Sequence, residues 1–132
     1  MRKEESNGES AKVQSRDEAA SRIVVKYRCA NDEHWTMSEI DQEIFELSGF
    51  PASEFLHNSV RTYSSIIHPE DRNRVEQTIC EAVSAKREYR IEYRIRRVDG
   101  DELKVFERGR GIYVEPGDVP LFLEGSISDG PP

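Results

Sequence analysis

The sequence predicts an α+β fold: a five-stranded antiparallel sheet covered on one face by short helices and one longer helix. Two observations carry this prediction. Apolar and charged side chains alternate strictly over residues 89–96 (YRIEYRIR), which is typical of a strand with one buried face. Residues 69–85 instead repeat their apolar side chains with helical spacing. Because each strand and helix has one apolar face only, the helices must cover one face of the sheet.

Length and composition predict one domain. The chain has 132 residues, of which 36% are hydrophobic and 34% charged. No apolar run approaches the roughly 20 residues of a membrane helix, and no export signal is visible, so we expect a cytoplasmic protein without a membrane segment. The net charge of −7 argues against nucleic acid as a partner. We divide the chain into a flexible tail with a short helix (1–21), a folded domain (22–129) and a C-terminal end (130–132).

The N-terminal part is expected to pass from a tail into strands. Residues 1–20 hold almost no large apolar side chains, so they are predicted to be disordered, with a short helix over 15–20 that packs on the domain or on a second copy. Residues 22–29 (RIVVKYRC) are β-branched and aromatic and predict a strand. Asn31-Asp32 suits a turn, and residues 35–40 predict a second strand.

Helices follow the second strand. Asp41 is a candidate cap for a short helix over 43–47 that ends at Gly49. Residues 53–56 suit one more turn, and Tyr63 anchors an irregular stretch. The segment beginning His68-Pro69 has the residue types of a helix start, and this helix is predicted to reach about residue 85. Its inward stripe comprises Val75, Ile79, Ala82 and Val83.

A long hairpin and a last strand complete the sheet. Asp99-Gly100 suits the turn between residues 89–96 and a returning strand over 103–114. With one extra residue in the turn, Leu103, Val105 and Glu107 face inward and Phe106 faces outward. After a turn over 115–118, the last strand alternates Leu121, Leu123 and Ile127 with Phe122, Glu124 and Ser126, and it is expected to pair beside the returning strand.

Three motifs then suggest a family. They are Leu47-Ser48-Gly49-Phe50-Pro51 with Glu54-Phe55; Ile67-His68-Pro69-Glu70-Asp71-Arg72; and Glu92-Tyr93-Arg94-Ile95 with Asp99-Gly100, Arg108-Gly109-Arg110, Gly125 and Asp129. In this order and spacing, residues 22–129 resemble the PAS domain family with its trailing PAC motif. The resemblance implies a PAS fold and a sensory or docking module of two-component or related signalling, placed beside histidine kinases or diguanylate cyclases. Lys104 stands where the family often has Trp, and Gly130-Pro131 where it often continues into an output helix.

The resemblance also bears on cofactors. Haem-binding members of the family place a histidine inside the long helix, and residues 71–85 contain none. Light-sensing members carry a reactive cysteine where this chain has Ser59, so we expect neither haem nor an adduct-forming flavin. The identity of any other cofactor stays open. The histidines His34, His57 and His68 predict no metal site, and Cys29 and Cys80 are expected to be buried thiols.

Aromatic side chains are expected to converge between helices and sheet. The alternatives are a filled core and a pocket for a small ligand with hydroxyl and indole donors. The candidate ligand-binding residues are Tyr27, Trp35, Phe45, Tyr63, Val75, Ile79, Tyr93 and Ile95.

Other residues are candidates for signal coupling. Phe106 and Phe122 are expected on the outer sheet face, where exposed aromatics indicate an interface. We therefore predict a homodimer formed through this face and the N-terminal helix. As the resemblance implies for Asp129, its carboxylate is expected to bond to Arg108 or Arg110, with Lys104 as the fallback.

Two function classes follow. The sequence favours a cytoplasmic sensor or dimerisation domain without catalytic activity. The alternative is a small acid–base enzyme that uses the pocket, with Glu107 as its carboxylate. Pairing of Glu107 with Arg94 or Arg108, or its exposure through strand twist, would count against the enzyme.

Overall fold

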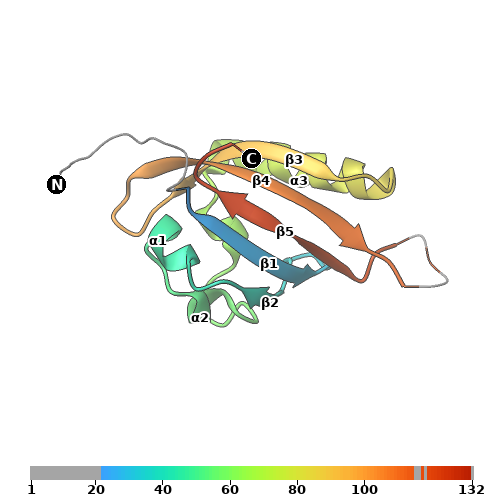
Figure 1. The fold of residues 1–132 in the computed structure, drawn as a ribbon, viewed down its shortest axis with the longest axis horizontal. Helices are drawn as coiled ribbons and strands as arrows, with labels where there is room; N and C mark the ends of the chain where they lie inside the picture. The colour runs from blue at the N-terminus through green and yellow to red at the C-terminus, as the bar shows by residue number, and fades with distance from the viewer. Residues whose placement is uncertain (1–21, 115–116, 118, 132) are drawn as a thin grey trace.

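The computed structural model describes residues 22–114, 117 and 119–131 and is built around a five-stranded antiparallel sheet of order β2-β1-β5-β4-β3. The helices cover one face of the sheet, as the sequence predicts (Figure 1). The predicted tail and helix over 1–21 lie outside the described residues, as does most of the 115–118 turn. The elements are β1 (Val24–Ala30), β2 (Met37–Ile40), α1 (Ile44–Ser48), α2 (Ala52–Phe55), η2 (Tyr63–Ile66), α3 (Pro69–Ser84), β3 (Tyr89–Arg96), β4 (Glu102–Ile112) and β5 (Phe122–Ser128).

The hairpin of β3 and β4 has the predicted register. Tyr93 lies opposite Val105, and Ile91 lies opposite Glu107. Directly opposed residues share a sheet face, so Val105 and Glu107 point toward the helices and Phe106 points away. Strand β5 then inserts between β4 and β1, which places the last strand at the centre of the sheet rather than at its edge.

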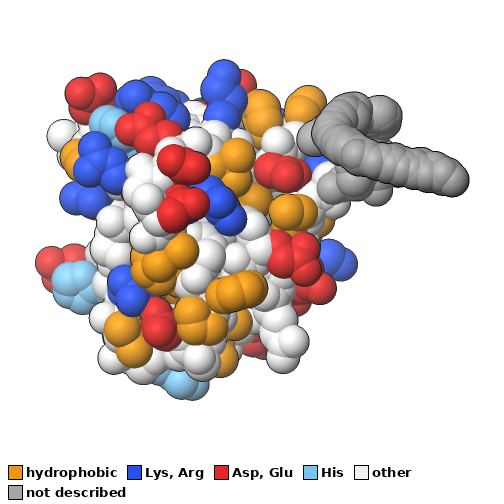
Figure 2. Space-filling model, turned by 90° about the vertical axis from the view of Figure 1, so that its left-hand side faces the viewer, with side chains coloured by type: hydrophobic (Ala, Val, Ile, Leu, Met, Phe, Trp, Pro, Cys, Tyr) orange, Lys and Arg blue, Asp and Glu red, His pale blue; other side chains and the backbone are white. Residues whose placement is uncertain are grey.

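Strand β2 is shorter than predicted, and α1 buries Ile44 and Leu47 but not Phe45. Trp35 precedes β2 in a loop with φ of 48°, which is not strand geometry. Asp41 does not cap α1: its carboxylate accepts the backbone N–H of Lys26 at 3.0 Å. Ile44 is buried, whereas the neighbouring Phe45 is 57% exposed. On the side of the molecule drawn in Figure 2, hydrophobic side chains (orange) lie at the surface.

Helix α3 packs along the sheet through the predicted stripe. His68 caps the helix, because its Nδ1 accepts the Glu70 N–H at 3.1 Å. Val75 and Ile79 are buried in the core. Cys80, expected to be buried, is exposed: it follows Ile79 directly, and a helix turns the next side chain about 100° away from the buried face. Within the described part of the chain, every helix falls short of the length or hydropathy that a membrane span requires.

An ion pair ties α3 to β3. The Asp71 carboxylate accepts the Arg94 Nε at 3.0 Å and the Arg94 backbone N–H at 2.9 Å. Asp71 is buried in spite of its charge, and the bonds from Arg94 hold the pKa of its carboxyl well below the usual range. This contact fixes the start of the long helix on the edge strand.

Replacing Asp71 by asparagine should therefore lower the free energy of unfolding by about 1.5–3 kcal/mol, the usual worth of hydrogen bonds to a charged group. Because the folded-state pKa is depressed, this stability is present above the unfolded pKa of about 3.9 and is lost as the pH falls through the folded pKa. Urea denaturation at pH 7 and pH 3 measures both effects. The control is Glu70→Gln, since the Glu70 side chain is 78% exposed. An Asp71→Asn deficit that stays constant with pH would contradict this account.

Candidate functional site

A buried carboxyl group lies at the centre of the core. Glu107 is 7% exposed and projects from the inner face of β4. The Tyr93 hydroxyl donates to its Oε1 at 2.6 Å, and the Tyr27 hydroxyl donates to its Oε2. Both carboxyl oxygens are therefore held by phenols, one from the adjacent strand β3 and one from β1, which lies beyond β5.

Two further tyrosines extend these contacts into relays. The hydroxyls of Tyr27 and Tyr89 are 2.7 Å apart, and those of Tyr63 and Tyr93 are 3.0 Å apart. Because Tyr27 and Tyr93 give their single protons to Glu107, the outer tyrosines must donate to them. Four hydroxyl groups are thus oriented toward one carboxyl, an arrangement that suits an acceptor with both oxygens unprotonated.

Facing glycines make room for one relay. Gly109 and Gly125 are opposed across β4 and β5, in a row whose ends are Tyr89 and Tyr27. A Cβ atom on Gly109 would lie 2.5 Å from the Tyr89 hydroxyl oxygen. The absence of a side chain at these two positions lets the tyrosines reach across the sheet and meet.

No basic side chain of the described residues pairs with Glu107. The two arginines that the sequence offered as partners are engaged elsewhere: Arg94 with Asp71 at 2.9 Å and Arg108 with Glu88 at 3.0 Å. Burial raises the pKa of the Glu107 carboxyl, and the bonds from Tyr27 and Tyr93 oppose that rise. Glu107 thus has the predicted inward position, and neither pairing with Arg94 or Arg108 nor exposure through strand twist accounts for it.

This raised pKa predicts a pH-dependent stability. Because the folded-state pKa of Glu107 exceeds the unfolded value of about 4.3, its contribution is complete below that pH and is lost as the pH rises through the folded pKa. Between the two pKa values the loss is about 1.4 kcal/mol per pH unit. The difference in unfolding free energy between the protein and its Glu107→Gln variant should shift accordingly in urea titrations from pH 4 to pH 9. A difference that does not vary with pH would contradict the prediction.

Glu107 forms one wall of a small cavity between the helices and the sheet. The cavity measures about 20 Å³, enough for about one water molecule. The core is thus almost filled, and of the two alternatives left by the sequence the filled core describes this conformation better. Lining side chains are Tyr27, Cys29, Trp35, Met37, Tyr63, Ile67, Val75, Ile79, Tyr89, Glu107, Leu123 and Ile127.

Five of the eight residues proposed for a ligand site line this cavity: Tyr27, Trp35, Tyr63, Val75 and Ile79. The other three do not line it.

Tyr93 lies behind Glu107, and Ile95 is buried farther along β3. Phe45 lies on the surface, so its place in the site was wrong. The alternation predicts that Tyr89 faces inward but not that it belongs to the site, because a period of two gives the face of a strand and not the reach of a side chain. Only the register of the hairpin predicts the inward position of Glu107.

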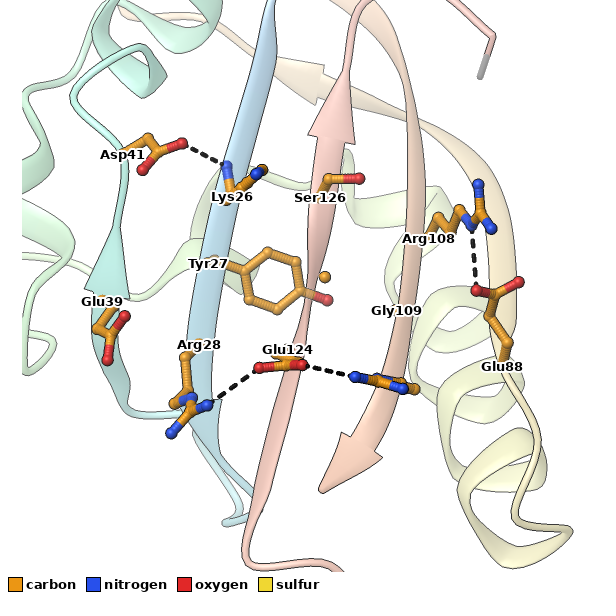
Figure 3. A pocket seen from close by; sticks show the side chains of 12 residues that line it. Lys26, Tyr27, Arg28, Glu39, Asp41, Glu88, Arg108, Gly109, Glu124 and Ser126 are labelled. Atoms are coloured by element: carbon orange, nitrogen blue, oxygen red, sulfur yellow. Dashed lines mark hydrogen bonds and ion pairs between the residues drawn. The ribbon is translucent and has the colours of Figure 1, made fainter. Parts of the chain in front are cut away.

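The outer face of the sheet carries a charged groove, seen closely in Figure 3. Glu124 on β5 bridges Arg28 on β1, at 3.1 Å, and Arg110 on β4, at 3.2 Å. Arg108 pairs with Glu88 beside it. The groove is open, has a volume of about 520 Å³ and alternates both signs of charge across the central strands.

Among the residues predicted to couple the signal, Phe106 and Phe122 have the predicted orientation, whereas Asp129 does not make its predicted bond. Phe106 and Phe122 face outward, and the Arg28 guanidinium lies 5.4 Å from the centre of the Phe122 ring. The Asp129 carboxylate accepts the Ile23 backbone N–H at 2.9 Å, and none of the basic side chains in the described residues pairs with it. The predicted bond to Arg108 or Arg110 is wrong, because these arginines lie opposite Ser126 and Glu124, earlier on β5, whereas Asp129 follows the end of the strand beside Ile23.

Lys104, the fallback partner, pairs with Glu92 instead. Burial raises the pKa of the Cys29 thiol to about 12, so it is not a thiolate nucleophile. Among the residues that the structure describes, no three histidine, cysteine, aspartate or glutamate side chains gather as metal ligands would.

Comparison with known proteins gives a consistent result. The family model described as PAS fold matches residues 37–124. The N-terminal domain of a diguanylate cyclase with PAS/PAC sensor from Marinobacter aquaeolei is 17% identical, with a TM-score of 0.69 over 80% of this chain and 94% of that one.

Two further solved structures are similar. A sensory box histidine kinase/response regulator from Burkholderia thailandensis is 21% identical, with a TM-score of 0.63 over 80% of this chain and 75% of that one. The Cycle PAS-B domain of Drosophila melanogaster, with bound ethylene glycol, is 15% identical, with a TM-score of 0.66 over 78% and 96%. At these identities the likeness shows the fold alone. No curated protein matches the chain.

Proposed function

Because the chain belongs to the PAS fold family, we propose that it is a cytoplasmic sensory signalling domain that regulates an output domain of the histidine kinase or diguanylate cyclase type. In this proposal the domain has no catalytic activity of its own. The state of the inner cavity alters the sheet, and the outer face of the sheet passes the change to a second copy of the chain or to the output domain. Two similar structures, from a diguanylate cyclase with PAS/PAC sensor and from a sensory box histidine kinase/response regulator, support this class.

The observation that carries the proposal is the position of β4 between the two sites. Glu107 points into the cavity, while the adjacent Arg108 and, two residues on, Arg110 line the outer groove. A shift of the Glu107 backbone therefore moves both groove arginines, each of which is bound to a carboxylate on a neighbouring element. The groove carries both signs of charge, so it is suited to dimerisation through matched ion pairs.

Native mass spectrometry of the protein purified from cells tests this proposal, since it reports bound mass and oligomeric state together. We expect either a non-covalent adduct of small-molecule mass or a dimer. For the dimer, Arg110→Glu should weaken association, because it reverses one charge of the groove and breaks the pair that Arg110 makes with Glu124 of its own chain at 3.2 Å. A monomer without added mass under all conditions would contradict both forms of the proposal.

The alternative of an acid–base enzyme is favoured by one observation, the raised pKa of Glu107 at a cavity wall. Against it, both oxygens of Glu107 already accept hydrogen bonds from tyrosines. In this conformation, with Trp35 in place, the cavity of about 20 Å³ holds no substrate beside the carboxyl group. The arrangement is better suited to sensing an occupant than to transforming one.

A further inference from the structure

Trp35 separates the inner cavity from a hollow on the surface. Trp35 lines both spaces, and the rest of the hollow is formed by Glu33 and His34 of the same loop, by α3 and by the segment before α3. The hollow measures about 410 Å³, against about 20 Å³ for the cavity. A rotation of this one side chain would join the two spaces into a passage that ends at Glu107.

The backbone around Trp35 is held in an unusual conformation. Trp35 has φ of 48°, a left-handed value that is rare for a bulky residue. His57 and Asn58 have φ of 56° and 54°, and Asn58 bonds to both sides of Trp35: its Nδ2 donates to the His34 carbonyl at 3.3 Å and its Oδ1 accepts the Met37 N–H at 3.2 Å. Strained positions of this kind cluster at active sites, ligand clamps and switch regions.

The inner end of the passage lacks a positive charge. Glu107 is buried, and none of the cationic side chains among the described residues pairs with it. A buried carboxylate is costly unless it is paired. The walls beside it are aromatic, and the faces of tyrosine and tryptophan rings attract cations. At the mouth, Glu33 and Glu76 outnumber Arg72.

We propose that the inner cavity takes a small organic cation, a protonated alkylamine, which enters past Trp35 and pairs with Glu107 inside a cage of tyrosine rings. The inference rests on the proposed sensory function and names the ligand class of its cavity. The ammonium group supplies the missing counter-charge and donates hydrogen bonds to Glu107 and the phenols. The alkyl chain occupies the space that Trp35 vacates, between the apolar side chains of Val75 and Ile79.

Calorimetric titration of the full chain with n-butylammonium chloride and with n-butanol, at equal ionic strength, tests the proposal. The two probes share length and shape and differ in charge. We expect butylammonium to bind at least tenfold more tightly than butanol. Equal affinity for both probes, or binding of neither, would overturn the proposal.

Variants locate the binding. Glu107→Gln should weaken butylammonium binding at least tenfold, whereas Glu92→Gln, which changes a largely exposed carboxylate on β3, should leave it unchanged. If Glu107→Gln does not fold, methyl NMR of the unmodified protein gives the answer: shifts at Val75 and Ile79 support the cavity, and shifts confined to surface residues contradict it. If native mass spectrometry finds a neutral adduct and butylammonium does not bind, the sensory proposal is supported and the cation proposal is refuted.

Discussion

Replacing Tyr93 by alanine should lower the free energy of unfolding by about 3–5 kcal/mol, the usual cost of truncating a core aromatic. Tyr93 is 2% exposed, so its whole ring contributes to the packing between β3 and the helices. Its hydroxyl group also donates to Glu107 at 2.6 Å and stands 3.0 Å from the Tyr63 hydroxyl. The alanine variant therefore leaves a cavity and two buried polar groups that have lost a partner. Urea denaturation at pH 7 measures the loss.

Two variants separate the parts of this effect. Tyr93→Phe keeps the ring and removes the hydroxyl, so it should cost about 1–3 kcal/mol, the penalty for leaving buried groups unsatisfied. Arg94→Ala changes the next residue, whose side chain faces the other way, and should cost less than Tyr93→Ala. Its cost is not negligible, however, because Arg94 holds the buried Asp71. Equal losses for Tyr93→Ala and Arg94→Ala would show that the two faces of β3 were misassigned.

The fold follows from signals that are local in sequence. Strict alternation over residues 89–96 and the residues of the turn predict the hairpin, its inward face and even the inward position of Glu107. The helix start at His68-Pro69 and the stripe containing Val75 and Ile79 predict the long helix and its buried side. The resemblance to PAS domains, carried by short motifs, is confirmed by the match of the family model.

The sequence predicts much less of the site than of the fold, for physical reasons. Helix α1 is five residues long, so its pattern could not decide whether the neighbouring Ile44 and Phe45 both face the core. The bond of Asp129 to the Ile23 backbone is a contact between chain segments 106 positions apart, with no residue-type signal, because any residue offers an N–H. The relays toward Glu107 depend on the length of each tyrosine side chain and on bare backbone at Gly109, neither of which a periodicity reports.

Gly125→Ala tests the central row of the sheet and should be one of the most damaging small substitutions in the domain. An added Cβ would lie 2.3 Å from the Arg108 carbonyl oxygen and 2.8 Å from the Gly109 Cα. Both are backbone atoms of β4, so the clash is relieved only by displacing β4 from β5. Overpacking of a core usually costs about 1–3 kcal/mol and occasionally more. We expect about 3 kcal/mol or more here, measured by urea denaturation against Ser126→Ala on the same strand.

Gly109→Ala provides the contrast that identifies the cause. The three atoms nearest to its added Cβ all belong to the Tyr89 side chain, at 2.5–2.8 Å. Shortening Tyr89 to leucine should therefore recover part of the stability lost in Gly109→Ala, whereas Tyr27→Leu should recover little in Gly125→Ala. If Tyr27→Leu rescues Gly125→Ala as well, the phenol and not the β4 backbone limits the space at Gly125. The two strands would then have room to separate, and the pairing of β4 with β5 would be looser than the contacts indicate.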